Sequence, residues 1–193
     1  MSKNSLDTEI SDLNSLLQSL ASSDDQIKKI IEDLTQCIKS GKKILICGNG
    51  GSAGEANHLA AEFIVRLKPK NNRDAIPMIS LSQNSSILTA CGNDYGFDKI
   101  FSRSIEALGV KNDVLICLST SGNSDNILKA LEAAKSKNIK SISLLGNNGG
   151  KAKSLSDLSL VISSNNTARI QECHLFLGHY ILSEVEKKLF NYD

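Results

Sequence analysis

Short apolar runs alternate with helix-like segments from Lys42 onward, and this alternation restricts the fold more than any other feature of the chain. The runs are KILIC, MISL, DVLICL, SISLL and SLVI. The intervening and following segments have helical character at 52–67, 84–109, 123–137 and 167–190. Strands that alternate with helices predict a parallel sheet with helices on both faces, and right-handed crossovers leave few topologies. We therefore expect an α/β fold with a five-stranded parallel sheet.

Two further helices are predicted ahead of the first strand. The first has apolar residues at steps of three and four, on one helix face: Leu6, Ile10, Leu13, Leu17 and Leu20. The second begins near Ser23 and Asp24, which are good N-cap residues, and ends at Gly41. The apolar faces of these helices need a partner, which can be the rest of the domain or another subunit.

No stretch of the 193 residues has the composition of a linker between domains. The polar segment Lys68–Asp74, KPKNNRD, is expected to be a surface loop. We therefore predict a single domain over 1–193, in which residues 1–41 form a helical pair used in packing or oligomerisation.

Composition and charge exclude several classes of protein. Lys and Arg total 22, Asp and Glu total 21, and no basic stripe is present, so a nucleic-acid-binding surface is not expected. No run approaches the ~20 apolar residues of a membrane span, and the N-terminus lacks the apolar segment of a signal peptide. The five cysteines match neither a disulfide framework nor paired metal-ligand spacing. These features predict a cytoplasmic protein with reduced thiols and no nucleic-acid or membrane partner.

Two of the predicted strands end in the same kind of sequence. Residues 43–52, KILICGNGGS, and 113–124, DVLICLSTSGNS, each run from apolar residues into glycine, serine, threonine and asparagine. In a flavodoxin-like strand order, 2-1-3-4-5, these are the first and third strands, and ligands bind beyond their carboxyl ends at the switch point between them. The sequence therefore predicts one pocket with two walls of small residues.

The composition of the two loops suits a phosphate group. Gly48, Gly50 and Gly51 allow backbone N–H groups to approach an anion, and the helix that follows presents its positive end. The second loop supplies four hydroxyl groups, from Ser119, Thr120, Ser121 and Ser124. Glycine and serine also form ordinary tight turns, and either loop alone is equally consistent with that. The pair at a switch point favours a phosphorylated ligand with a polyhydroxylated body.

Two better-known phosphate motifs do not fit. Residues 48–53, GNGGSA, formally match the dinucleotide fingerprint, but the next strand ends in Ser82 and Gln83 where an acidic residue is needed. The Gly-Lys-Ser/Thr of a Walker A loop is absent. Nicotinamide cofactors and ATP are therefore not expected.

Titratable residues follow the first loop and recur in the last helix. His58 and Glu62 share one helix face, where they can form a metal-ligand pair, a carboxylate held by an imidazole, or an ordinary surface pair. The last helix contains Gln171, Glu172, His174 and His179, of which His174 is expected to pack. Gln171 and His179 are ~12 Å apart along a helix axis, so they meet at one centre only if both reach toward it or the helix start distorts. Otherwise they serve different sites, and glutamine is an unusual zinc ligand.

Four segments together resemble the sedoheptulose 7-phosphate isomerases, the phosphoheptose isomerases of the sugar-isomerase (SIS) fold: CGNGGSAGEANHLAAEF, CGNDYGFDKIFSR, LSTSGNSDN and TARIQECHLFLGH. The similarity covers nearly the whole chain. The loop motifs are common to SIS domains in general, whereas His58 and Glu62 combined with Gln171 and His179 are much more specific. The resemblance implies one SIS domain preceded by two helices, in a homotetramer with active sites at subunit interfaces.

The resemblance also implies roles for individual residues. It implies substrate contacts by ten loop and turn residues: Asn49, Gly50, Gly51, Ser52, Asn93, Asp94, Ser119, Thr120, Ser121 and Ser124. It implies one Zn²⁺ per subunit, with His58, Glu62, Gln171 and His179 as ligands, and Glu62 and Gln171 also contact substrate. Arg66 matches a family arginine, although a solvated helix position explains it nearly as well. Glu55 is expected on the surface.

An enzyme of this family would convert D-sedoheptulose 7-phosphate to D-glycero-D-manno-heptose 7-phosphate through an enediol or enediolate, the first step toward heptose for surface polysaccharide. Glu62 would be the base at carbon and His179 the acid/base at the oxygens. Two other functions stay open. One is a non-catalytic binding protein of the replication-initiator-binding type, in which the pair equivalent to Glu62 and His179 is expected to be lost. The other is a different phosphosugar isomerase or a sensor with the same phosphate loops.

Overall fold

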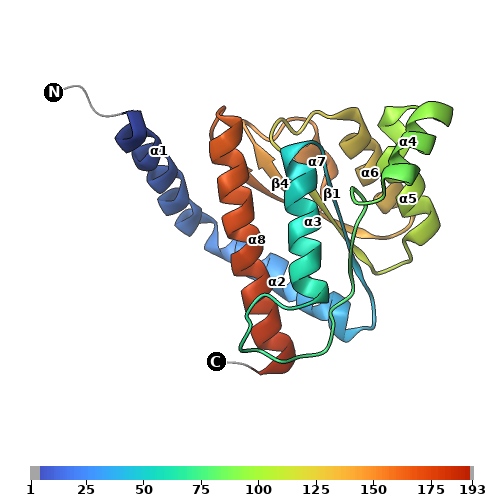
Figure 1. The fold of residues 1–193 in the computed structure, drawn as a ribbon, viewed down its shortest axis with the longest axis horizontal. Coiled ribbons are helices and arrows are strands. Elements are labelled where there is room, and N and C mark those ends of the chain that lie inside the picture. The colour runs from blue at the N-terminus through green and yellow to red at the C-terminus, as the bar shows by residue number, and fades with distance from the viewer. Residues whose placement is uncertain (1–4, 192–193) are drawn as a thin grey trace.

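Strands and helices alternate along the chain as the sequence predicts. A computed structural model describes residues 5–191 (Figure 1). The strands are β1 Ile44–Gly48, β2 Met78–Ser80, β3 Val114–Ser119, β4 Lys140–Gly146 and β5 Leu158–Ile162. The helices are α1 Ser5–Ser19, α2 Asp24–Lys39, α3 Gly51–Ile64, α4 Ser85–Asp94, α5 Ile100–Leu108, α6 Asp125–Ser136, α7 Ala152–Leu155 and α8 Thr167–Phe190. Two short 3-10 helices, η1 Leu20–Ser23 and η2 Phe97–Lys99, join neighbouring helices.

The sheet is parallel throughout and has the order β2-β1-β3-β4-β5. This is the predicted flavodoxin-like order, and its direction of winding reverses between β1 and β3. Gly48, at the end of β1, is in register with Leu118, near the end of β3. The loops that follow these two strands therefore leave the same edge of the sheet side by side.

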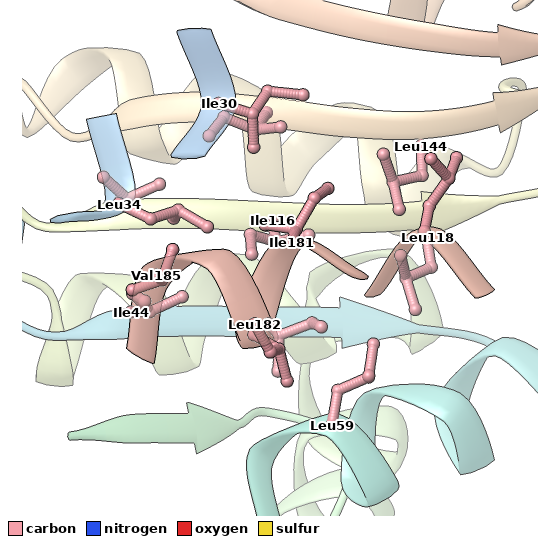
Figure 2. Close-up of a cluster of buried hydrophobic side chains, with 14 of the residues drawn as sticks. Ile30, Leu34, Ile44, Leu59, Ile116, Leu118, Leu144, Ile181, Leu182 and Val185 are labelled. Carbon is pink, nitrogen blue, oxygen red and sulfur yellow. The ribbon is translucent and has the colours of Figure 1, made fainter. Parts of the chain in front are cut away.

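Alternate strand residues supply the two layers of the core. Ile44 and Ile46 of β1 pack in the layer of α2, α3 and α8, whereas Leu45 and Cys47 pack in the layer of α4, α5 and α6. Figure 2 shows part of the first layer, in which side chains of the sheet face side chains of α3 and α8: Ile44, Ile116, Leu118, Leu59, Ile181, Leu182 and Val185. Aliphatic residues fill both layers because every interior strand is covered on both faces.

The two N-terminal helices differ in how they pack. α2 buries Ile27, Ile30, Ile31 and Leu34 against the first layer. α1 has no buried residue and extends away from the body of the molecule (Figure 1). Leu6 and Ile10, at its start, are 61% and 50% exposed, although they belong to the apolar face predicted for this helix. Arg169 of α8 binds Glu9 at this end of α1, but the side chains of Leu6 and Ile10 stay largely exposed within the described part of the chain.

Several predicted boundaries need correction. The segment 84–109 is not one helix, because α4 ends at Asp94 and the chain turns through Gly96, whose φ is 98°, before η2 and α5. α3 ends at Ile64 rather than at residue 67, and the single-turn helix α7 was not predicted. Residues 68–74 do form a loop, but the side chain of Arg73 within it is fully buried. Among residues 5–191, no helix is long and apolar enough to cross a membrane.

Candidate active site

The loop after β1 runs directly into α3 and is fastened to the neighbouring crossover. Asn49 and Asn126 exchange two amide hydrogen bonds, of 2.8 and 2.9 Å, between the β1 loop and the first turn of α6. On the other side of the loop, the Ser82 hydroxyl donates to the Gly48 carbonyl at 2.9 Å. These contacts hold the β1 loop against its neighbours at the switch point.

The loop after β3 uses its hydroxyl groups in two ways. The Ser119 and Ser121 hydroxyls accept backbone hydrogen bonds from Gly122 and Asn123, at 3.0 and 3.2 Å, and so shape the turn. Ser124 is the N-cap residue of α6 but makes no side-chain capping bond, so its hydroxyl is available at a positive helix end. An open cleft of about 800 Å³ adjoins this loop, and its lining is neutral and polar: Ser121, Asn123, Asn147, Asn148, Ser163, Ser164 and Asn165. The lining of this cleft does not include His58 or His179.

The start of α3 is covered by Gln171 of α8. The Gln171 amide nitrogen lies 3.5 Å from the hydroxyl of Ser52, which is buried. A Cβ atom at Gly51 would lie only 2.4 Å from that amide nitrogen, so the amide can rest on the loop only because residue 51 is glycine. Gln171 therefore belongs to the β1 loop in this chain.

Glu55, also in the first turns of α3, was predicted to lie on the surface, and this prediction is wrong. Both of its carboxylate oxygens are buried and have no hydrogen-bond partner of normal geometry. Burial raises the pKa of Glu55 to about 7, and the neighbouring Ser52 hydroxyl offsets part of this shift. A buried carboxyl group with a raised pKa thus lies in the first turns of α3.

His58, Glu62 and His179 converge further along the same two helices. The Nε2 atoms of His58 and His179 are 2.8 Å apart, and the two rings are nearly perpendicular, at 78°. Glu62 Oε1 lies 3.7 Å from His58 Nε2. The side chains of His58 and Glu62 are 45% and 24% exposed, so the cluster is open at the surface. Burial and the adjacent His58 lower the pKa of His179, and the Glu62 carboxylate partly opposes this.

A close approach of α3 and α8 brings this cluster together. The two helices lie side by side in Figure 1. At Gly178, a Cβ atom would lie 2.6 Å from Leu59 Cδ1, which is shorter than any normal carbon–carbon contact. Gly178 and Leu59 immediately adjoin His179 and His58 in sequence. The two imidazoles meet because glycine allows the helix backbones to approach here.

Other predicted site residues lie elsewhere. Asn93 and Asp94 are exposed at the end of α4, in the layer on the opposite face of the sheet from α8, and the Asn93 amide donates to Asp94 at 2.7 Å. Arg66 is exposed just beyond α3. His174 is fully buried in α8, as predicted, and burial lowers its pKa to about 4. Within one chain, the structure therefore joins the β1 loop to the start of α6 and brings His58, Glu62 and His179 together further along α3, whereas Asn93 and Asp94 belong to neither group.

The donor chemistry of the histidine cluster suits zinc, which prefers imidazole nitrogen and carboxylate oxygen. Two nitrogens bound to one tetrahedral zinc at about 2.0–2.1 Å lie roughly 3.3 Å apart, so His58 and His179 would separate by about half an ångström. Within residues 5–191, no group of three or more His, Cys, Asp and Glu side chains is already arranged as a metal site. The residues that fit a metal are His58, Glu62 and His179, while Gln171 is turned toward Ser52.

Comparison with known proteins identifies the family. The sequence profile described as the SIS domain matches residues 10–146. Phosphoheptose isomerases from Synechocystis and Helicobacter pylori are 49% and 48% identical to the chain, with at least 90% of each sequence covered. The chain belongs to the phosphoheptose isomerases. The resemblance inferred from the four motifs is thereby confirmed.

Solved phosphoheptose isomerases have the same fold as this family member. The structure from Neisseria gonorrhoeae superposes with a TM-score of 0.88 at 35% identity and covers 94% of this chain and 97% of its own. The structure from Francisella tularensis gives 0.85 at 32% identity and covers 95% and 99%. Vibrio vulnificus NanR, in complex with ManNAc-6P, is only 16% identical and shares the fold alone, with a TM-score of 0.69. The predicted fold class is confirmed, and these two phosphoheptose isomerases match over at least 94% of each chain.

Sequence reasoning missed three residues that contact the elements carrying the site. Asn126 follows the STSGNS loop but was not singled out. Gly178 was not singled out either, although it interrupts an apolar helix face beside His179. Arg73 was missed because it lies in a polar segment. The signal for Gly178 was present in the sequence, since glycine within a helix costs stability unless a close contact requires it.

Proposed function

We propose that this protein isomerises D-sedoheptulose 7-phosphate to D-glycero-D-manno-heptose 7-phosphate. The observation that carries the proposal is the convergence of Glu62 and His179 around His58 on the helix that begins at the glycine loop. His58 and Glu62 lie about two and three turns into that helix, or roughly 10 and 16 Å along its axis. A phosphate held at the start of α3 would thus leave the other end of its sugar near the histidine cluster. Membership of the phosphoheptose isomerases supports the same substrate.

The reaction moves one proton between adjacent carbons and another between their oxygens. Glu62 takes the proton from C1 of the ketose and returns it to C2, because a carboxylate is a suitable base for a carbon acid next to a carbonyl. His179 exchanges protons at the two oxygens, and its lowered pKa favours the neutral imidazole, which can both donate and accept. The serine hydroxyls and backbone N–H groups of the two loops hold the phosphate, so that binding energy there orients the reacting carbons.

The proposal includes one Zn²⁺ per subunit, held by His58, Glu62 and His179. A bound divalent ion supplies a Lewis acid that polarises the carbonyl of the sugar. Gln171 would join this ligand set only if its side chain left Ser52, so we assign it to the β1 loop, where it can contact substrate through its amide.

We also propose a homotetramer with interfacial active sites, in the cytoplasm. The exposed apolar residues at the start of α1 support an association between subunits, since Leu6 and Ile10 have no partner within one described chain. All five cysteines are buried and free, which fits a reducing compartment. A neighbouring subunit could also bring Asn93 and Asp94 to a site they do not reach within their own chain.

The acid/base assignment is tested with Glu62→Gln and His179→Gln, which keep size and hydrogen-bonding capacity. Turnover of sedoheptulose 7-phosphate should fall by at least ~10²-fold in each variant, as expected for loss of a proton-transfer group. Near-normal turnover in both variants would show that these residues do not carry the reaction.

A substrate panel separates the proposed activity from its rivals. The purified protein is incubated with sedoheptulose 7-phosphate and with shorter ketose phosphates, and the aldose products are measured. We expect conversion of the seven-carbon substrate in preference to the others. Conversion of a shorter sugar alone would indicate a different phosphosugar isomerase, and binding without conversion of any sugar would indicate a binding protein.

A further inference from the structure

Helices α3 and α8 run in the same direction and are in contact at three successive levels. At the first, the Gln171 amide rests on Gly51. At the second, Gly178 meets Leu59 beside the two histidines. At the third, the C-terminal end of α3 and the last turns of α8 are joined through Arg73, which belongs to neither helix. The histidine cluster lies between the second and third levels.

Arg73 uses all three of its guanidinium nitrogens in this junction. Its Nε donates to Glu186 Oε1 at 2.6 Å. Its Nη2 donates to the backbone carbonyl of Glu62, and its Nη1 to that of Phe63, each at 2.9 Å. The Arg73 and Glu186 side chains are 0% and 1% exposed. A single buried cation therefore binds two backbone carbonyls at the end of α3 and the carboxylate of α8.

The residues joined by Arg73 are those that set the reactive geometry. One of its partners is the backbone of Glu62 itself. Another, Glu186, is seven residues beyond His179, which is about 10 Å, or two turns, along the same face of α8. The distance between Glu62 and His179 thus depends on how far apart Arg73 holds the two helices.

Stability alone does not account for this ion pair. A buried ion pair loses so much hydration that well-packed apolar residues are often equally stable in its place. Moreover, Glu186 Oε2 is buried without a hydrogen-bond partner, so the carboxylate is incompletely compensated. An apolar pair could fill the same space but could not make the directional hydrogen bonds to the Glu62 and Phe63 carbonyls.

We propose that Arg73, with Glu186 as its anchor, is a positioning residue that fixes the separation of Glu62 and His179 during isomerisation. This inference rests on the proposed acid/base roles of that pair. Arg73 lies at the opposite end of α3 from the phosphate loops, so it should affect turnover more than substrate affinity. The loop containing Arg73, which has the composition of a simple surface connection, would then be part of the catalytic framework.

Kinetics of Arg73→Met and Arg73→Lys test the proposal. A misplacement of about 1 Å can lower a rate ~10²-fold, so kcat should fall ~10- to 100-fold in Arg73→Met, while KM changes less than about threefold. Lysine keeps the charge but has one nitrogen where arginine uses three separate nitrogens for these acceptors, so Arg73→Lys should have an intermediate kcat. A folded Arg73→Met with kcat within twofold of the wild type would overturn the proposal.

Two controls separate positioning from stability. Asp113→Asn removes the anion of a partly buried ion pair, Lys43–Asp113, at the amino ends of β1 and β3 and so at the opposite end of these strands from the site, and should lower the melting temperature with kcat unchanged. The double variant Arg73→Met/Glu186→Leu should regain stability without regaining kcat, because it restores packing but not the bonds to α3. Recovery of kcat together with stability would assign Arg73 a merely structural role. This double variant and Arg73→Lys keep the test valid if Arg73→Met does not fold.

A spectroscopic readout distinguishes failure of this inference from failure of the proposed function. The chain has three histidines, so ¹⁵N spectra of the imidazoles resolve His58, His174 and His179. Arg73→Met should shift the Nε2 signals of His58 and His179 but leave His174, which packs elsewhere in the core. If the wild type does not convert sedoheptulose 7-phosphate, the proposed function fails, while these shifts still test positioning. Unchanged signals from His58 and His179 would contradict it.

Discussion

Gly178→Ala is the smallest substitution that tests how the histidine cluster is held. The added Cβ would lie 2.6 and 2.7 Å from the two δ-methyl carbons of Leu59, whereas carbon atoms in good contact are ~3.5–4.0 Å apart. Leu59 is 3% exposed and Gly178 is buried, so neither the added methyl group nor the Leu59 side chain can escape the contact by moving into solvent. We expect α3 and α8 to separate locally by about 1 Å, because the shortfall in contact distance is of that size.

The consequences for stability and for activity should be very different in size. Overpacking of this kind costs ~1–3 kcal/mol, and alanine recovers ~1 kcal/mol of this through its higher helix propensity than glycine. The net loss of about 0–2 kcal/mol corresponds to a fall of a few degrees in melting temperature for a chain of this length. The same displacement acts on His58 and His179, which adjoin the contact, and misplacement by 1 Å can cost ~10²-fold in rate. The kcat should therefore fall by up to ~10²-fold in a protein that is still folded.

The measurement is a comparison of kcat and melting temperature across four proteins. Gly54→Ala is the matched control, since Gly54 is in the same helix α3 but a Cβ there meets nothing within 4 Å. It should be stabilised slightly, with normal kcat. Leu59→Ala should rescue part of the activity when it is combined with Gly178→Ala, because the clashing methyl carbons are removed. Normal kcat with an unchanged or higher melting temperature in Gly178→Ala would refute the reasoning.

The pH dependence of stability and the removal of metal test other parts of the structure. Burial lowers the pKa of His174 to about 4 in the folded protein, whereas an unfolded histidine titrates near 6.5. As the pH falls from 6.5 to 4.5, the wild type should therefore lose about 2–3 kcal/mol of unfolding free energy relative to His174→Gln, as measured by urea denaturation. An equal loss in both proteins would contradict this. Glu55 has a pKa raised to about 7, so its stabilising protonated form is lost as the pH rises from about 4.5 through 7. The melting temperature of Glu55→Gln should therefore gain on the wild type across that window and run parallel to it above, and a constant difference would show that Glu55 titrates normally. Dialysis against a chelator should abolish turnover and added Zn²⁺ should restore it, whereas full activity with no metal measured in the sample would remove zinc from the proposal.

Strand order was predictable because it follows from the alternation of apolar runs and helical segments along the chain. Aliphatic runs such as 114–118 have to be covered on both faces, and that requirement with right-handed crossovers leaves few arrangements. Helix boundaries were less predictable, since the break after Asp94 depends on a single positive φ at Gly96 rather than on polarity. The burial of Glu55 was not predictable at all, because it results from the packing of a polar helix start against other elements.

The same distinction separates the parts of the site. Both loops and the pair His58 and Glu62 could be identified, because each lies in one segment whose spacing has a direct geometric meaning. The partner of Gln171 could not be identified, since eight residues of helix separate it from His179 and only the coordinates show which neighbour it meets. Arg73 was assigned to a surface loop because its sequence neighbours are polar, whereas its environment is determined by Glu186, 113 residues further along the chain.

If α3 binds the phosphate at its first turn and carries the acid/base groups further along, as proposed, its geometry has a consequence for substrate specificity. The distance from Gly51 to Glu62 is determined by the helical rise and cannot adapt to a shorter sugar without bending α3. In this arrangement adaptation would have to come from α8, which contacts α3 at Gly51 and Gly178 and is joined to its end through Arg73. We therefore expect such a chain to select substrate length through helix geometry. Variants at Gly178 or Arg73 that loosen α8 should therefore lose discrimination against shorter ketose phosphates as well as turnover, since the cluster would no longer be held at one distance from the phosphate loops.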